Sequence, residues 1–216
     1  MRSEVDLTVF QLFMPFGAVI RENKNWLVLA AAIFIMSALL VYNLALSGRD
    51  TLGQYFDLQS EQLQELLNLI LNAPPFIAAL MIFINNFISL AQMLFFGALA
   101  GVSPLLTLAL NGALLGFTSA AASASGVALV PLLTLGILPH GIFELPAFIL
   151  CGALGLKFGY HCVASPLPGM SRLQSFKYIW KEAISVLPVV VLLLLAAAFI
   201  EILITPQLLA MFTDTI

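Results

Sequence analysis

The chain has 216 residues and a formal net charge of -3, with 62% hydrophobic and only 9% charged residues. Soluble domains carry about 25% charged residues, so this composition excludes an ordinary water-soluble domain and predicts an integral membrane protein. The small net charge comes without a basic patch, which argues against a nucleic-acid partner. The length suits a single membrane domain covering residues 1–216, with the lipid bilayer as its first partner.

Four apolar stretches are each long enough to cross a membrane as one helix, which takes about 20 residues. They are residues 26–46, 76–99, 104–122 and 187–204. Residues 1–25 mix acidic and basic side chains, which is not the pattern of a secretory leader. We therefore expect a cytoplasmic segment followed by an uncleaved signal anchor. Glu201 lies near the end of the last span, where its side chain can reach the membrane interface.

Residues 127–160 form a further apolar region that is too long for one ordinary span and tight for two. Pro131, Pro139 and Pro146 interrupt it, and proline removes a backbone donor and clashes with the preceding turn. We expect a short, re-entrant or broken first segment, a break near Leu138–Gly141, and a helix to about Gly159. The predicted fold is an all-α polytopic transmembrane helical bundle of about five spans.

Two connecting segments have the apolar spacing of amphipathic helices. Residues 58–71 place several leucines on one face, and residues 172–182 combine aromatic and apolar side chains with four charges. Both segments are predicted to lie at the membrane interface. Each could cover the bundle or dock a partner, and the covering role is the preferred interpretation.

The basic residues predict an orientation. With five crossings, all of them except Arg49 lie on one side of the membrane. The positive-inside rule then places the N-terminus in the cytoplasm and the C-terminus outside, in a multipass protein of the cell membrane.

His140 and Glu144 are the most conspicuous ionisable residues at predicted membrane depth. They are four positions apart and share one face of a helix that Pro139 can begin. Three roles stay open: a proton or cation site, a metal site, and a structural pair in which Glu144 accepts hydrogen bonds. The structural role is the preferred interpretation. A zinc site needs at least three protein ligands, so neither a metal nor another cofactor is predicted.

Asn86 and Asn111 belong to the same polar set, because each can donate and accept hydrogen bonds between helices. Three pairs of glycines have the small-xxx-small spacing that lets helix backbones approach closely. They are Gly97/Gly101, Gly112/Gly116 and Gly155/Gly159. This spacing predicts tight packing and, more weakly, a homo-oligomer.

The sequence contains no spacing typical of an enzyme. No nucleophile elbow, zinc-protease motif or phosphate-binding loop occurs, so the chain is not predicted to be an enzyme. An intramembrane hydrolase stays open, because Ser, His and Glu could meet in space. Cys151 and Cys162 would lie about 16 Å apart on a helix, too far for a disulfide, and are predicted to be free thiols.

The residues from Phe83 to Tyr160 also carry a family resemblance. In order, they are Phe83-Ile84-Asn85-Asn86, Gly97-x-x-x-Gly101, Leu110-Asn111-Gly112-x-x-x-Gly116, Pro139-His140-Gly141-Ile142-Phe143-Glu144-Leu145-Pro146-Ala147 and Gly152-x-x-Gly155-Leu156-x-x-Gly159. This pattern resembles the stage II sporulation protein M family, and His-Gly-x-x-Glu is its most specific element. The resemblance implies a multipass inner-membrane protein and carries over Asn86, Asn111, His140 and Glu144. The namesake works with a peptidoglycan hydrolase and a second partner in spore-forming bacteria; sporulation itself is not carried over.

Two functional hypotheses follow. The first is a non-enzymatic scaffold or assembly partner in a membrane complex, joined to a second copy or to other membrane or cell-envelope proteins. The second is a channel or transporter for a small ion or solute, with its polar site at the broken helix around His140 and Glu144. Discontinuous helices are a common way to build such sites, but the sequence contains no inverted repeat.

Overall fold

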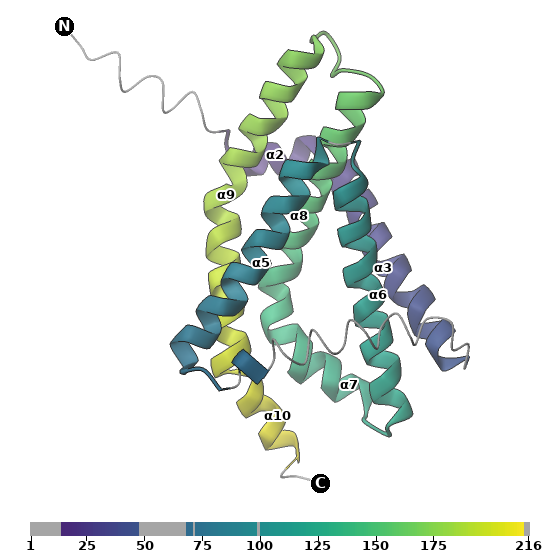
Figure 1. The fold of residues 1–216 in the computed structure, drawn as a ribbon, viewed down its shortest axis with the longest axis vertical. Coiled ribbons are helices and arrows are strands. Elements are labelled where there is room, and N and C mark those ends of the chain that lie inside the picture. The colour runs from purple at the N-terminus through teal and green to yellow at the C-terminus, as the bar shows by residue number, and fades with distance from the viewer. Residues whose placement is uncertain (1–13, 48–67, 71, 99, 214–216) are drawn as a thin grey trace, which may run out of the picture.

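The computed structural model describes residues 14–47, 68–70, 72–98 and 100–213, and every element that it assigns within these ranges is helical. In chain order they are α2 (Phe16–Glu22), α3 (Lys24–Leu46), α5 (Pro75–Gly97), α6 (Val102–Ala124), α7 (Leu129–Pro131), the π-helical turn η2 (Leu132–Ile137), α8 (Leu138–Val163), α9 (Arg172–Leu203) and α10 (Thr205–Thr213) (Figure 1). Five helical stretches among the described residues are long and apolar enough to cross a membrane. The predicted all-α bundle is confirmed.

Helix α8 is the centre of the bundle. It packs against α3, α5, α6 and α9, and α3 packs most extensively on α6. Nearly every residue of α8 between Ala147 and Gly159 is buried. Leu154 from this stretch shares one core with Leu90 and Met93 of α5, Leu108 of α6 and Leu194 of α9. The position of α8 therefore decides where the other spans can lie.

Glycines let α5 and α6 approach α8 backbone to backbone. A Cβ atom on Gly97 would lie 2.7 Å from the carbonyl oxygen of Gly155, which real Cβ atoms do not tolerate. Gly159 faces the backbone of Gly101, whose φ of +71° favours glycine in the tight link between α5 and α6. The first and third predicted glycine pairs thus meet each other across one helix contact.

The remaining glycine pair lies in the contact between α3 and α6. Gly112 lies against the backbone of Phe34, and Gly116 lies against that of Ala38. All three glycine pairs therefore make close contacts inside one chain. These contacts do not require a second copy of the protein.

The proline-rich region bends without being interrupted. The sequence predicts a break near Leu138–Gly141, but the structure is helical from Leu129 to Val163 and its irregularity is the π-helical turn of η2 at Leu132–Ile137. Pro139 lies in the first turn of α8, directly after η2, and cannot donate a backbone hydrogen bond to the preceding turn. The wider π-turn accommodates the irregularity one turn earlier, and Figure 1 shows the chain changing direction between α7 and α8.

One expected interfacial helix is part of a longer helix. Residues 172–182 are the beginning of α9, which continues to Leu203 through Pro188 and so replaces a separate helix before a span at 187–204. A capping box formed by Ser171 and Gln174 starts α9, and Ile179 and Glu182 are buried on it. Ile179 and Glu182 therefore pack inside the bundle, whereas Leu173 and Phe176 of the same segment are exposed. The other expected interfacial helix, at residues 58–71, lies outside the described residues except for positions 68–70.

Substitution of Gly159 by alanine should destabilise the bundle, because the new Cβ would overlap the backbone of Ala100 and Gly101. Overpacking of this kind costs about 1–3 kcal/mol in the free energy of unfolding. Unfolding of the purified protein in mixed micelles, followed by circular dichroism against added SDS, measures the change.

The matched control is Gly141→Ala in the same helix. The atoms nearest to a Cβ there are the side chains of Ile137 and Leu145, both at 3.8 Å. Its stability should stay within about 0.5 kcal/mol of the wild type. Equal losses in the two variants would contradict the close-contact explanation.

Candidate functional site

Two antiparallel helices bring three potential ligands together in the membrane domain. His140 and Glu144 project from the same face of α8, and Glu201 projects from the end of α9. One ligand-type atom from each residue lies within 4.8 Å of the other two. We call these three residues the α8–α9 cluster. The sequence placed Glu201 toward the membrane interface, whereas its carboxylate lies beside His140 and Glu144.

Helix α5 adds an amide to the α8–α9 cluster. Asn86 Nδ2 donates a hydrogen bond to Glu144 Oε1 at 3.0 Å. Asn85 Nδ2 in turn donates to Asn86 Oδ1 over 3.4 Å, and Asn85 is exposed. A short chain of side-chain contacts therefore runs from the outer face of α5 to the carboxylate of Glu144. This agrees with the role predicted for Asn86, a hydrogen-bond donor from another helix.

The α8–α9 cluster combines like charges with an unsatisfied donor or acceptor. Two carboxylates this close repel each other when both are ionised, and a hydrocarbon environment does not solvate them. The Nδ1 atom of His140 is buried and has no hydrogen-bond partner among the described residues. The arrangement can therefore share protons between its members or hold a cation.

Asn111 does not join the cluster. It is exposed, and its Nδ2 donates to the carbonyl oxygen of Thr107 on its own helix at 2.8 Å. Of the four polar residues singled out in the sequence, His140, Glu144 and Asn86 come together, and Asn111 lies apart. Cys151 and Cys162 are free thiols, as predicted.

A second polar centre is an ion pair that the sequence reading missed. Lys157 Nζ on α8 donates to both carboxylate oxygens of Glu182 on α9, at 2.8 and 2.6 Å. Glu182 is fully buried, and Lys157 is only 4% exposed. The charge of Lys157 is therefore compensated by Glu182 inside the protein and does not contribute to the surface charge. Lys157 is two residues from both Gly155 and Gly159, so it lies on the opposite face of α8, and the glycine spacing gave no sign of its partner.

The ion pair also holds the N-terminal part of the described chain. Asn23 lies at the corner between α2 and α3 and is fully buried. Its Nδ2 donates to Glu182 Oε1 at 2.7 Å and to the carbonyl oxygen of Val19 at 2.8 Å. Nearby, Tyr178 donates its hydroxyl hydrogen to Glu22 Oε2 at 2.6 Å. The geometry gives this centre a structural role, since it joins α2, α3, α8 and α9.

The two polar centres fit one antiparallel register. His140 precedes Lys157 by 17 residues, and Phe199 follows Glu182 by the same 17 residues. When Lys157 and Glu182 lie opposite each other, antiparallel packing therefore places His140 opposite Phe199, two residues before Glu201. Recognition of the ion pair would have located the third member of the cluster.

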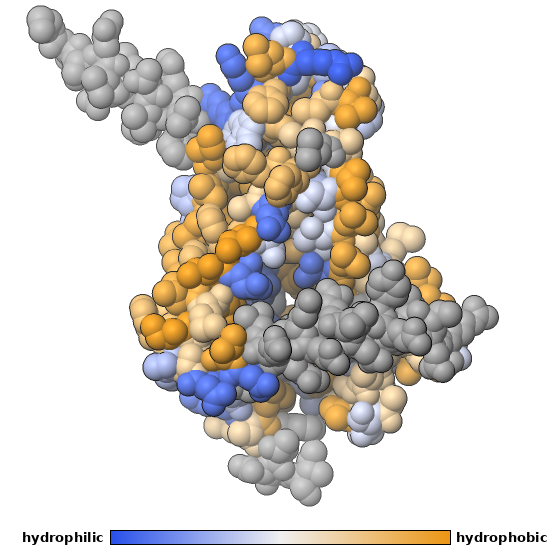
Figure 2. All heavy atoms as spheres, in the orientation of Figure 1, coloured by the Kyte–Doolittle hydropathy of each residue, from blue (hydrophilic) through white to orange (hydrophobic). Residues whose placement is uncertain are grey.

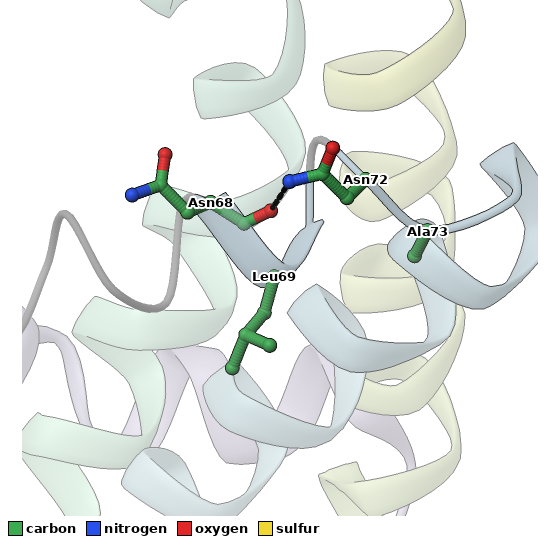
Figure 3. Close-up of a pocket in the computed structure, with 4 residues that line it drawn as sticks. All are labelled: Asn68, Leu69, Asn72 and Ala73. Carbon is green, nitrogen blue, oxygen red and sulfur yellow. Dashed lines mark hydrogen bonds between the residues drawn. The ribbon is translucent and has the colours of Figure 1, made fainter.

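Neither of two surface cavities includes the α8–α9 cluster. One, of about 600 Å³, lies at the residues before α5 and is lined by Asn68, Leu69, Asn72 and Ala73 (Figure 3). Asn72 Nδ2 donates to the carbonyl oxygen of Asn68 at 2.7 Å. None of these four side chains is titratable or nucleophilic, so this cavity offers hydrogen bonding and apolar contact only.

The other cavity lies on the outer face of α5 and has a volume of about 220 Å³. It is lined by Phe87, Ile88, Ala91, Gln92, Phe95 and Phe96. Gln92 is exposed and has no hydrogen-bond partner among the described residues. An amide on a lipid-facing surface is unusual, because hydrocarbon offers it no partner.

A family model described as Stage II sporulation protein M matches residues 27–206, which covers most of the chain. The matched range contains Asn86, the whole α8–α9 cluster and the Lys157–Glu182 ion pair. No curated protein and no solved structure matches this chain.

Replacement of Lys157 by methionine should lower the free energy of unfolding by about 3–5 kcal/mol, because it leaves the Glu182 carboxylate buried without its counter-charge. Thermal unfolding in detergent, followed by circular dichroism, measures the loss.

Two further variants test the cause. Lys177→Met, at an exposed position of α9, should change the stability by no more than about 0.5 kcal/mol. The double variant Lys157→Met/Glu182→Leu should recover most of the stability, since it removes both charges. A single Lys157→Met variant as stable as the wild type would rule out this account.

Proposed function

Since the chain belongs to the stage II sporulation protein M family, we propose that this integral membrane protein acts as a non-enzymatic assembly subunit of a membrane complex. The family match and the five apolar helices establish the membrane class. In the bilayer, the protein presents a surface on which a helix of another protein docks.

The observation that carries this proposal is the polar face of α5. Asn85 and Gln92 are seven positions apart, so they lie on the same side of the helix, and both are exposed. The cavity of about 220 Å³ lies beside Gln92. Figure 2 shows hydrophilic side chains at mid-height on this face of the molecule, between hydrophobic flanks.

A second helix on this face would satisfy the exposed amides. Amide side chains hydrogen-bond between membrane helices, and each such bond contributes about 0.6 kcal/mol on average. The aromatic side chains around the cavity would supply van der Waals contact. We take the partner to be an apolar transmembrane helix, carrying at least one hydrogen-bonding side chain, of another membrane or cell-envelope protein.

The glycine contacts support a partner of a different kind over a homo-oligomer. The spacing that suggested self-association is used inside the chain, where Gly97 lies against Gly155 and Gly112 lies against Phe34. These contacts and the buried ion pair also make the bundle a rigid support. A rigid surface loses little entropy when a partner binds.

The basic residues support an orientation in the cell membrane with the N-terminus in the cytoplasm. Tyr178 at the start of α9 bonds Glu22 of α2, so the two segments lie at the same end of the bundle. Arg21, Lys24, Arg172 and Lys177 are exposed in these segments. The positive-inside rule assigns that end to the cytoplasm, even without Lys157, and the C-terminal end to the outside.

A photo-crosslinking residue placed at Ile88 should capture a single partner helix in intact membranes. Mass spectrometry of the crosslinked product identifies the partner, and the further substitution Gln92→Leu should lower the yield by about threefold, the loss of one average interhelical hydrogen bond. The same probe at Leu39, which is exposed on α3, is the matched control. A second copy of the chain as the only product, or equal yields at the two positions, would contradict the proposal.

The α8–α9 cluster favours transport as a second candidate. Asn85 and Asn86 connect the outer face of α5 with Glu144, as a path for protons or cations could. Proteoliposomes loaded with a pH-sensitive or cation-sensitive dye should then show flux that Glu144→Gln reduces by at least about tenfold, because removal of an ionisable site closes the path. Flux no higher than in empty liposomes would exclude this candidate and leave the assembly proposal standing.

A further inference from the structure

The geometry of the α8–α9 cluster points to a metal site. We propose that His140, Glu144 and Glu201 bind one divalent first-row transition metal ion, with Zn²⁺ as the reference case, and that this ion fastens α8 to the end of α9. The inference goes beyond the assembly role and does not depend on it.

The ligand set fits zinc, because imidazole nitrogen and carboxylate oxygen are among its usual ligands. With three protein ligands, the fourth position of the tetrahedron would be taken by water. The sequence alone offered two ligands, His140 and Glu144. Glu201 supplies the third from another helix, over a separation of 57 residues from Glu144.

The distances between the three ligand atoms are close to those of a zinc site. A zinc ion lies about 2.0–2.2 Å from nitrogen and oxygen ligands, so tetrahedral geometry sets the ligand atoms about 3.3–3.6 Å apart. The three ligand atoms already lie within 4.8 Å of one another. Changes in side-chain torsion that move each ligand atom by about 1 Å would bring the three atoms to this spacing.

A hydrogen bond from Asn86 orients the carboxylate of Glu144. Ligating carboxylates are usually held by a second hydrogen bond that fixes their orientation. Asn86 Nδ2 donates a hydrogen bond to Oε1 of Glu144 at 3.0 Å. The other carboxylate oxygen, Oε2, is then available to bind a metal. Asn86 is therefore a positioning residue for the ligand.

The charge of the cluster also favours a cation. When both carboxylates are ionised and the imidazole is neutral, the cluster carries a formal charge of -2, which a divalent cation would cancel. Lys157 cannot do so, because it lies 17 residues from His140 along α8, about 25 Å at the rise of a helix, and is paired with Glu182.

An independent sign of a missing partner comes from the unsatisfied polar atoms. His140 Nδ1 is buried without a hydrogen-bond partner among the described residues, and the same holds for Thr205 Oγ1, one helical turn beyond Glu201. Thr205 is only 7% exposed. Buried polar atoms are nearly always satisfied in native proteins. Asn23 Oδ1, beside the Lys157–Glu182 ion pair, also lacks a partner among the described residues, but His140 Nδ1 belongs to the cluster itself and so indicates a bound group there.

The test uses the full-length protein with a histidine-free affinity tag, purified in detergent, stripped with EDTA and dialysed against Zn²⁺, Mn²⁺ or Mg²⁺. Elemental analysis should find about one equivalent of zinc per chain, and the melting temperature should rise with zinc. Glu201→Gln should lower the bound zinc by more than about tenfold and abolish the zinc-dependent rise, while its melting temperature in EDTA shows that it is folded.

His140→Gln repeats the measurement with a second ligand if Glu201→Gln fails to fold. The matched controls are His161→Gln and Glu22→Gln, which replace the same residue types outside the cluster and should bind zinc like the wild type. Absence of zinc from the wild type, binding of Mg²⁺ alone, or undiminished zinc in both ligand variants would overturn the proposal.

Discussion

Hydrocarbon solvates neither charge nor unpaired hydrogen-bonding groups, so each polar side chain within this bundle needs a partner from the protein or from something bound to it. Helix α8 shows the constraint most clearly, because it carries Lys157 toward one end and His140 and Glu144 toward the other. Lys157 and Glu182 satisfy each other in a buried ion pair. Their pairing fixes the register of α9 and, through Asn23, the position of the α2–α3 corner.

Close backbone contact complements this polar framework. The glycines of α5, α6 and α8 bring the helices together without side chains between them, which gives van der Waals attraction where the hydrophobic effect cannot drive association. Most of the outward faces are then left apolar, as α3 shows with Leu39 and Leu40. Asn85 and Gln92 on α5 depart from this pattern, as does Asn111 on α6. The cavity beside Gln92 directs attention to α5 as the face that meets a partner.

The sequence predicted the features that depend on local pattern: the number of spans, the free thiols, and a hydrogen bond from an asparagine of another helix to Glu144. It did not predict the roles of Glu182 and Glu201, because these depend on which helix lies opposite and in what register. The predicted break lies a few residues after the observed bend, because the π-turn of η2, before Pro139, takes up the irregularity. The charges of residues 172–182 suggested an interfacial helix, whereas one of them is buried against Lys157.

The long sequence separation of the buried contacts has a consequence for biosynthesis. Asn23 and Glu182 are 159 residues apart, and Lys157 and Glu182 are 25 apart. A ribosome adds about 5–20 residues per second, so the first span enters the bilayer seconds before Glu182 exists. Until then Lys157 has no counter-charge, and the corner at Asn23 has no anchor. Insertion of the last long helix is therefore the step that closes the bundle, because Glu182 completes both contacts at once.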